Sequence, residues 1–335
     1  MRKVSGTSMS GKSILKVLAA AAVIWGLSVP SASALEFKFA HSGSLEHQYH
    51  IGAEYFKKLV EEKSGGEIKV NIFPQAQLGS EREEAEGVRM GTIEVTAIAA
   101  GGALPGFVPE MQVLGVPYLF KSRAQAYKAL DGEVGAELNR CMEAKGFRNL
   151  AYWEVGFRNF TNGIRPIKTP ADMKDLKIRV QESKIWMEFI SRLGGIPTPI
   201  PFSELYSALQ QKVVDGEENP VATIYSMKYY EVQKYLSLDR HTYEAAAVLA
   251  NPKWFAGLTP DQQTIILEAA AETSDYQRKF LEDQEVQQLD VIRKAGVEIL
   301  ENPDIDAFAE ATKDLYKVLG DVIPESLIEK IRAGS

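Results

Sequence analysis

The sequence is short of the residue types that several classes of protein require. It has one cysteine, Cys141, in 335 residues, which excludes an intramolecular disulfide and any cysteine-based zinc or iron–sulfur site. It has no block of basic residues, and 38 Lys and Arg are outnumbered by 45 Asp and Glu. Because nucleic-acid phosphates are neutralised by clustered Lys and Arg, we expect no nucleic-acid partner.

The N-terminal apolar run is also too short to cross a membrane. Val17–Val29 has 13 residues, whereas a membrane span needs roughly 20. A positively charged, acid-free segment precedes the run, and the small residues Ser31–Ala34 follow it with an Ala-x-Ala pattern. This order predicts a secretory signal peptide that is cleaved after Ala34. The four basic residues of the segment are Arg2, Lys3, Lys12 and Lys16.

The rest of the chain has the composition of a folded protein. The sequence is 45% hydrophobic and 25% charged, which excludes a disordered chain. Taking 34 residues and four positive charges from 335 residues of net charge −7 leaves 301 residues of net charge −11. That length exceeds what one hydrophobic core usually organises, so we expect two domains.

The first part of the mature chain alternates between strand and helix patterns. Apolar alternation and helical spacing predict strands over 36–41, 67–73 and 93–99 and helices over 48–64 and 81–90. This order is typical of a parallel α/β sheet. Such sheets bind ligands at the carboxyl ends of their strands, here just after His41, Phe73 and Ala99.

A second α/β set follows, and then one long helix. Strands are predicted over 147–153, 178–181 and 245–250, and helices over 184–193 and 203–212. Thr259, Pro260 and Gln262 form a helix start with a capping box, and no Gly or Pro follows from Asp261 to Ala295. A helix of that length reaches about 50 Å, so we expect it to cross both domains.

Two arginines and one asparagine are the candidate ligand-binding residues that the pattern itself offers. Arg158 and Arg179 lie at the ends of predicted strands, and a guanidinium group binds a carboxylate through two charge-assisted bonds. An interdomain salt bridge or a surface charge is the alternative. Asn219 lies in the segment Asp215–Pro220, whose composition predicts an acceptor-rich turn. The sequence leaves two roles open for its side chain, which are contact with a polar ligand and capping of a helix.

Two further motifs suggest other chemistries. His47 and His50 are three residues apart and His41 is nearby, so a zinc site is an alternative to solvated histidines. Gly6–Ser13 has the letters of a phosphate-binding loop but lies in the leader, without the strand and helix that phosphate binding needs. We therefore expect neither a nucleotide nor any other cofactor.

Four segments resemble one family, the solute receptors of TRAP transporters of the dicarboxylate-receptor (DctP) type. The similarity runs in order along essentially the whole mature chain, and the D-G-x-E-N-P motif is its most specific part. The four segments are Gln77–Gly79 (QLG), Pro199–Gln210 (PIPFSELYSALQ), Val214–Pro220 (VDGEENP) and Tyr230–Tyr235 (YEVQKY).

The resemblance implies a fold and its domain boundaries. It implies a two-domain α/β periplasmic binding protein that closes on its ligand, with the long helix spanning both domains. Residues 35–155 plus 245–284 would form domain I, and residues 156–244 plus 285–335 would form domain II.

The resemblance also implies roles for individual residues. Arg179 matches the arginine that anchors the ligand carboxylate, Arg158 a second arginine that supports it, Asn219 a ligand contact and Phe202 an aromatic of the cleft. Glu81 occupies the position of an acidic residue that reaches the far end of the ligand in the sialic-acid receptors of this family. A second acid of those receptors falls at about Ala99 here, which argues against sialic acid. Contacts vary between family members at two more positions, which are His47 and Glu182.

The implied function is therefore reception of a solute in the periplasm, without catalysis. The ligand would be a C4-dicarboxylate or a sugar acid such as a hexuronate, and the protein partner a TRAP permease in the membrane. We expect the protein to be mostly monomeric, and a dimer is the alternative. The alternatives are a secreted metal-dependent hydrolase that uses His41, His47 and His50, and a receptor for an uncharged solute.

Overall fold

A computed structural model describes residues 34–334 of the chain. Residues 1–33 of the predicted leader, which include the phosphate-loop letters, lie outside these residues. The strands are β1 (Leu35–Ala40), β2 (Ile68–Phe73), β3 (Val95–Ala99), β4 (Arg148–Asn162), β5 (Lys177–Val180), β6 (Ile196–Pro199), β7 (Gly216–Pro220), β8 (Tyr235–Ala250) and β9 (Glu298–Leu300).

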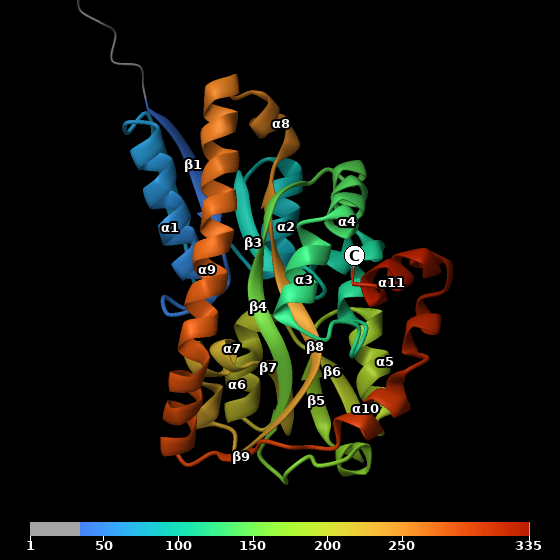
Figure 1. Cartoon of the computed structure of the whole chain (residues 1–335). Coiled ribbons are helices and arrows are strands. Elements are labelled where there is room, and N and C mark those ends of the chain that lie inside the picture. Colours follow the sequence, from blue (N-terminus) through green and yellow to red (C-terminus); the bar gives the residue numbers. More distant parts are fainter. Residues whose placement is uncertain (1–33, 335) are drawn as a thin grey trace, which may run out of the picture. The chain divides into compact units, whose positions relative to one another are not determined.

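Helices flank these strands (Figure 1). They are α1 (Gln48–Lys63), α2 (Glu81–Met90), α3 (Arg123–Leu130), α4 (Glu133–Ala144), α5 (Lys184–Arg192), α6 (Leu205–Gln210), α7 (Val221–Ser226), α8 (Pro252–Ala256), α9 (Pro260–Lys294), α10 (Ile305–Thr312) and α11 (Glu325–Arg332). Short 3₁₀ segments occupy Leu104–Gly106, Pro109–Gly115, Pro170–Met173, Phe202–Glu204, Tyr229–Glu231 and Leu315–Val322.

One mixed sheet connects the strands in the order β2-β1-β3-β8-β4-β7-β5-β6, and β9 pairs with β8. β1 pairs in parallel with both β2 and β3, which confirms the parallel α/β pattern predicted for the first part of the chain. β5 pairs in parallel with β6 and β7. The two parallel groups are joined through antiparallel pairs that involve β4 and β8. The predicted α/β fold class is therefore confirmed.

β4 and β8 are much longer than the sequence pattern predicts. The pattern predicts strands over 147–153 and 245–250, but β4 has 15 residues and β8 has 16. The additional residues include charged side chains such as Arg158, Asp239 and Glu244, which do not form an apolar strand pattern. They are buried because polar groups of neighbouring strands bind them. Arg158 therefore lies inside β4 and not at a strand end.

The segment Asp215–Pro220 is also different from its prediction. We expected a turn, but Gly216–Pro220 forms β7, whose five residues are all buried. The prediction failed because Asp, Gly, Asn and Pro are typical turn residues. Here the side chains of Glu217 and Glu218 bind Thr161 and Arg158 of β4, and Pro220 precedes the first residue of α7.

The long helix is confirmed, because α9 has 35 residues and begins with the predicted capping box at Thr259. Three elements pack along it, which are α1, β4 and α7 (Figure 1). Near the middle of α9, Nε2 of Gln277 donates to the carbonyl of Glu154 in β4 at 2.6 Å. Oε1 of the same side chain accepts from the backbone N–H of Glu154 at 2.9 Å. No helix within residues 34–334 has the length and hydropathy of a membrane span.

We predict that Gly52→Ala destabilises the fold by about 1–3 kcal/mol, which is the usual cost of overpacking. A Cβ at Gly52 in α1 would lie 2.6 Å from the ring of Trp153, and that ring is itself completely buried in the core. Urea unfolding measures the change. Gly163→Ala is the control, because its Cβ would meet only a carbonyl oxygen at 3.8 Å. Equal stability of Gly52→Ala and the wild type would contradict this packing.

Candidate functional site

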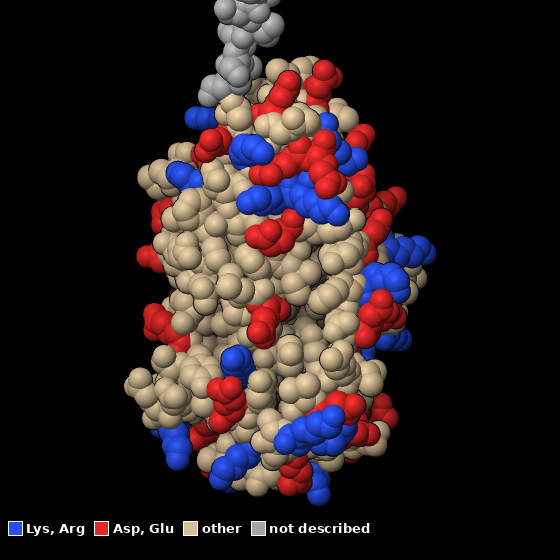
Figure 2. Space-filling view, turned by 90° about the vertical axis from the view of Figure 1, so that its left-hand side faces the viewer, with Lys and Arg blue, Asp and Glu red and all other residues tan. Residues whose placement is uncertain are grey.

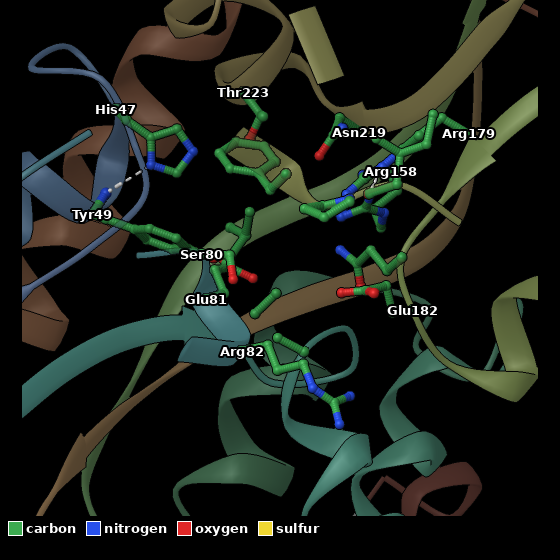
Figure 3. Close-up of a pocket in the computed structure, with 17 residues that line it drawn as sticks. His47, Tyr49, Ser80, Glu81, Arg82, Arg158, Arg179, Glu182, Asn219 and Thr223 are labelled. Atoms are coloured by element: carbon green, nitrogen blue, oxygen red, sulfur yellow. Dashed lines mark hydrogen bonds between the residues drawn. The ribbon is translucent and has the colours of Figure 1, made fainter. Parts of the chain in front are cut away.

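A polar cavity lies where several segments between His47 and Thr223 meet (Figure 3). It contains about 510 Å³ of space that no atom occupies, part of it open to solvent. The cavity is lined by all seven residues that the sequence singled out, which are His47, Glu81, Arg158, Arg179, Glu182, Phe202 and Asn219.

The strand-end rule explains much of this arrangement. Glu81 is the first residue of α2, Ala99 ends β3, and Arg179 is the third residue of the four-residue strand β5. Asn219 is near the end of β7, just before α7. The loops and helix starts that follow these strands therefore meet at the cavity, as in other α/β sheets.

Arg179 presents a buried, unpaired positive charge to the cavity, whereas Arg82, which also lines it, is exposed. Its side chain is 2% exposed, and its Nε donates to the carbonyl of Ile200 at 2.9 Å. Its Nη1 is buried and has no hydrogen-bond partner, and none of the salt bridges found within residues 34–334 includes Arg179. Burial lowers the pKa of Arg179, and the nearby Arg158 acts in the same direction. A guanidinium group nevertheless keeps its charge in proteins, so an anion would find a desolvated donor here.

Arg158 is in a different state, because carboxylates already bind it. Its Nε and Nη2 donate to the two carboxylate oxygens of Glu218, and Nη2 also donates to the Glu218 carbonyl. Its Nη1 lies 3.4 Å from Oε2 of Glu244. Burial acts to lower the pKa of Arg158, but the Glu218 carboxylate outweighs it and the pKa is raised. Arg158 thus forms a salt bridge and also lines the cavity, but its partners lie in the same predicted domain, so this is not the interdomain bridge that we gave as the alternative.

A buried histidine completes this ion-pair cluster. Nδ1 of His241 lies 2.8 Å from Asp239, and its Nε2 lies 3.1 Å from Glu218. Burial alone would lower the pKa of His241, but the two carboxylates outweigh it and raise the pKa to about 9. The cluster of Arg158, Glu218, His241 and Asp239 is therefore charged but internally paired at neutral pH.

Glu81 lies in the cavity among neutral hydrogen-bond donors. The hydroxyl of Ser42 donates to it at 3.2 Å, and the Tyr49 hydroxyl and the Ala99 backbone also bind it. Burial raises the pKa of Glu81, and these donors and the charge of Arg179 oppose the shift only in part. Glu81 is thus suited to accept hydrogen bonds from hydroxyl groups of a ligand.

The histidines do not form the zinc site that we considered. His47 caps α1 by accepting from the Tyr49 backbone at 3.2 Å, and its other ring nitrogen points into the cavity (Figure 3). His41 instead pairs with His50, Nε2 to Nδ1 at 3.1 Å. Within residues 34–334, no group of three or more His, Cys, Asp or Glu is arranged to hold a metal ion.

The remaining two candidates lie toward the edge of the cavity. The ring of Phe202 faces His47, with ring centroids 5.6 Å apart. Glu182 is exposed, and it also borders an open depression at the mouth of the cavity. Phe202 is therefore a wall of the cavity, and Glu182 is part of its entrance.

Sequence reasoning missed several lining residues, of which Gln181, Tyr49 and Thr223 are the most informative. Gln181 directly follows β5, so the strand-end rule was a usable signal for it. Its Oε1 is buried without a partner, while its Nε2 lies 3.4 Å from Glu244. Tyr49 and Thr223 carry no such signal, because each reaches the cavity from the first turn of a helix. Unpartnered atoms of Arg179, Gln181 and His47 thus converge on one cavity, which suits a small polar ligand.

Comparison with known proteins gives consistent matches. The chain matches the family described as bacterial extracellular solute-binding protein, family 7, over residues 39–321. It is 36% identical to the 2,3-diketo-L-gulonate-binding periplasmic protein YiaO of Escherichia coli (strain K12), over 92% of each chain.

Two solved structures of TRAP periplasmic solute-binding proteins are similar as well. One is from Polaromonas sp. JS666, bound to D-erythronate, with a TM-score of 0.86 and 34% identity over 89% of this chain and 98% of that chain. The other is from Sulfitobacter sp. NAS-14.1, with bound β-D-galacturonate, a TM-score of 0.85 and 34% identity over 89% and 99% of the chains.

We predict that Glu218→Gln lowers the free energy of unfolding by about 3 kcal/mol or more, because it leaves Arg158 buried with a weakened partner. Urea unfolding at pH 7 measures this loss. Glu231→Gln is the control, since Glu231 binds only the Tyr206 hydroxyl on the surface. A loss below about 1 kcal/mol would contradict the role of the cluster in stability.

We also predict that stability falls as the pH rises from 6.5 to 9. The folded-state pKa of His241 is about 9, above the unfolded value of 6.5. Its contribution is therefore complete below pH 6.5 and is lost as the pH passes 9. The stability difference between the wild type and His241→Gln should shrink over this range in urea titrations. A constant difference would show that His241 is not charged in the fold.

Proposed function

Because the chain belongs to the family 7 bacterial extracellular solute-binding proteins, we propose that it receives a sugar acid through Arg179 and delivers it to a TRAP permease. Receptors of this family bind small organic acids and are not enzymes, and this protein is likewise a receptor. The comparisons give no support to the secreted metal-dependent hydrolase, which we therefore abandon.

The unpaired guanidinium of Arg179 is the observation that carries the carboxylate assignment. A buried cation without an ion-pair partner is costly unless a ligand supplies the negative charge. The carboxylate of Glu218 already neutralises Arg158. Only Nη1 of Arg158, which lies 3.4 Å from Glu244, is therefore available to a ligand. We therefore assign the ligand carboxylate to Arg179 and a supporting role to Arg158.

The balance of donors and acceptors favours a sugar acid over a dicarboxylate. Beyond Arg179, the cavity presents the cation Arg82 and the Nε2 donor of His47, together with acceptors such as the unpartnered oxygen of Gln181. Hydroxyl groups donate to such acceptors, whereas a second carboxylate is repelled by them. The ligands of the three relatives described above, 2,3-diketo-L-gulonate, D-erythronate and β-D-galacturonate, are all acids of the sugar series.

Affinity in this protein has to come from local contacts. The mature chain would have a net charge of −11, so no long-range field attracts an anion. Charge-assisted hydrogen bonds contribute about 1.5–3 kcal/mol each, and two of them with several hydroxyl contacts are enough for micromolar binding.

We further propose that binding closes two domains, residues 35–155 plus 245–284 and residues 156–244 plus 285–335. Three contacts join these parts beside the cavity. Ser44 donates to the Ser226 carbonyl at 2.9 Å, Gln48 donates to Thr223 at 2.8 Å, and His47 contacts Phe202. Closure of this kind removes water from the Arg179 contact and gives the permease a form to recognise.

The setting of the receptor completes the proposal. Its relatives are periplasmic, and we propose export by a signal peptide that is cleaved after Ala34. We propose that the receptor acts as a monomer, with the ligand as its only small-molecule partner.

We predict that Arg179→Ala weakens binding of the ligand at least 100-fold, since two charge-assisted bonds of about 1.5–3 kcal/mol are lost. A thermal-shift screen of D-galacturonate, D-erythronate, 2,3-diketo-L-gulonate and succinate first selects the acid, because a bound ligand raises the melting temperature. Calorimetry then compares the wild type with the variant.

Arg89→Ala is the matched control, because Arg89 is an exposed arginine of α2 that does not line the cavity. Unchanged affinity in Arg179→Ala would disprove the assignment of the carboxylate. A shift with succinate but with none of the sugar acids would disprove the ligand class.

A further inference from the structure

The two ring nitrogens of His47 are in different situations. Nδ1 accepts a hydrogen bond from the backbone N–H of Tyr49 at 3.2 Å, which caps the start of α1. Nε2 is buried and has no hydrogen-bond partner within residues 34–334, and Figure 3 shows it facing the cavity. A buried polar atom without a partner is unusual in a folded protein and calls for an explanation.

The helix cap decides which of the two nitrogens carries the hydrogen. In a neutral imidazole, one nitrogen donates and the other accepts. Because a backbone N–H can only donate, Nδ1 is the accepting nitrogen and Nε2 carries the hydrogen. Burial lowers the pKa of His47 well below its usual value, and the nearby His41 acts in the same direction. The ring is therefore neutral at pH 7 and presents one N–H donor to the cavity.

Backbone on one side and aromatic rings on the other hold the imidazole in place. A Cβ on Gly43 would lie 2.4 Å from Nδ1 of His47 and 2.6 Å from its Cβ, so glycine leaves the room that the ring needs. The ring centroids of Tyr49 and Phe202 lie 4.4 Å and 5.6 Å from that of His47. The direction of the donor is thus set before a ligand arrives, which lowers the entropic cost of binding.

Donors inside the cavity matter because the surface attracts no anion. On the face of the molecule in Figure 2, Lys and Arg are interspersed with Asp and Glu and form no basic patch. In Figure 3, His47 and Arg179 lie on opposite sides of the group of lining residues. We propose that His47 is a specificity-determining residue whose Nε2–H donates to an oxygen atom of the ligand away from its carboxylate. This inference rests on the proposed function, because Arg179 holds the carboxylate of the same ligand.

The consequence is a rule about the ligand. A hydroxyl or carbonyl oxygen accepts from His47, whereas an ammonium or methyl group in that place leaves the buried N–H unpaired. Glu81 lies on the same side of the cavity, since Tyr49 binds His47 through its backbone and Glu81 through its hydroxyl. A second carboxylate there would meet the carboxyl group of Glu81, so a hydroxyl group fits best. The receptor therefore selects hydroxy acids over amino acids and deoxy acids.

Two substitutions of His47 separate the donor from the helix cap. His47→Asn keeps the cap, because the oxygen of asparagine accepts from the same backbone N–H, but the shorter side chain no longer presents a donor to the cavity. His47→Gln does the reverse, because its longer side chain places an NH₂ group near the position of Nε2, whereas glutamine is not a preferred cap. The control for loss of a cap alone is Ser122→Ala, since Ser122 caps α3 and does not line the cavity.

Calorimetry uses whichever acid gives the largest thermal shift among D-galacturonate, D-erythronate and 2,3-diketo-L-gulonate. We expect His47→Asn to bind this acid at least about tenfold more weakly than the wild type, with an unchanged midpoint of urea unfolding. His47→Gln should bind within about threefold of the wild type, although its midpoint falls as that of Ser122→Ala does. Unchanged affinity in His47→Asn would overturn the inference, and so would an equal loss of affinity in both His47 variants.

NMR spectroscopy of the mature wild-type protein tests the inference without any variant. The ¹⁵N signals of a histidine ring distinguish the nitrogen that carries hydrogen, and contacts with the Phe202 ring assign those of His47. We expect the hydrogen on Nε2 at pH 7, and we expect this N–H signal to shift when the acid binds. A hydrogen on Nδ1, or an N–H signal that does not move on binding, would overturn the inference. Failure of all three acids to bind would contradict only the proposed function.

Discussion

The ion pair between Arg158 and Glu218 is the interaction on which the rest of the site depends. It is completely buried, and it joins β4 to β7 while His241 and Asp239 extend it into β8. Such a pair is expensive to desolvate and is stable only when its remaining donors and acceptors are satisfied. Because the cluster is internally satisfied, it lets two long strands run through the centre of the sheet with charged residues inside them. It also takes up the charge of one of the two buried arginines of the cavity.

The different partners of Arg158 and Arg179 explain the chemistry of the cavity. Arg158 maintains the sheet, and Arg179 keeps an unpaired donor for the ligand. The remaining polar groups of the cavity include the acceptors Glu81 and Gln181 and the exposed cation Arg82. One buried, unpaired cation with acceptors beside it is complementary to a molecule with one carboxylate and several hydroxyl groups. The same arrangement lets an acidic receptor bind an acid.

Much of the fold was predictable from the sequence, and the failures have a common cause. The first parallel unit, α5 and the 35-residue helix α9 follow from apolar spacing and capping residues, which act locally. The polar halves of β4 and β8 and the whole of β7 were not predictable, because their side chains are polar and resemble loop residues. They are buried only because each finds its partner on another strand, far away in the sequence. Local spacing contains no information about such partners.

The sequence by itself determined the class of fold, the long helix and, through the family resemblance, seven of the residues that line one cavity. These follow from local patterns and from motifs that survive in order along the chain. Only the tertiary structure decided how those residues differ in role: Arg158 is paired, Arg179 is not, and His47 caps a helix while one ring nitrogen faces the cavity. It also decided that the Asn219 side chain donates a hydrogen bond to the buried carboxyl group of Glu217. The physical reason is that hydrogen-bond partners and desolvation depend on which strands become neighbours, and that is settled only when the whole sheet has formed.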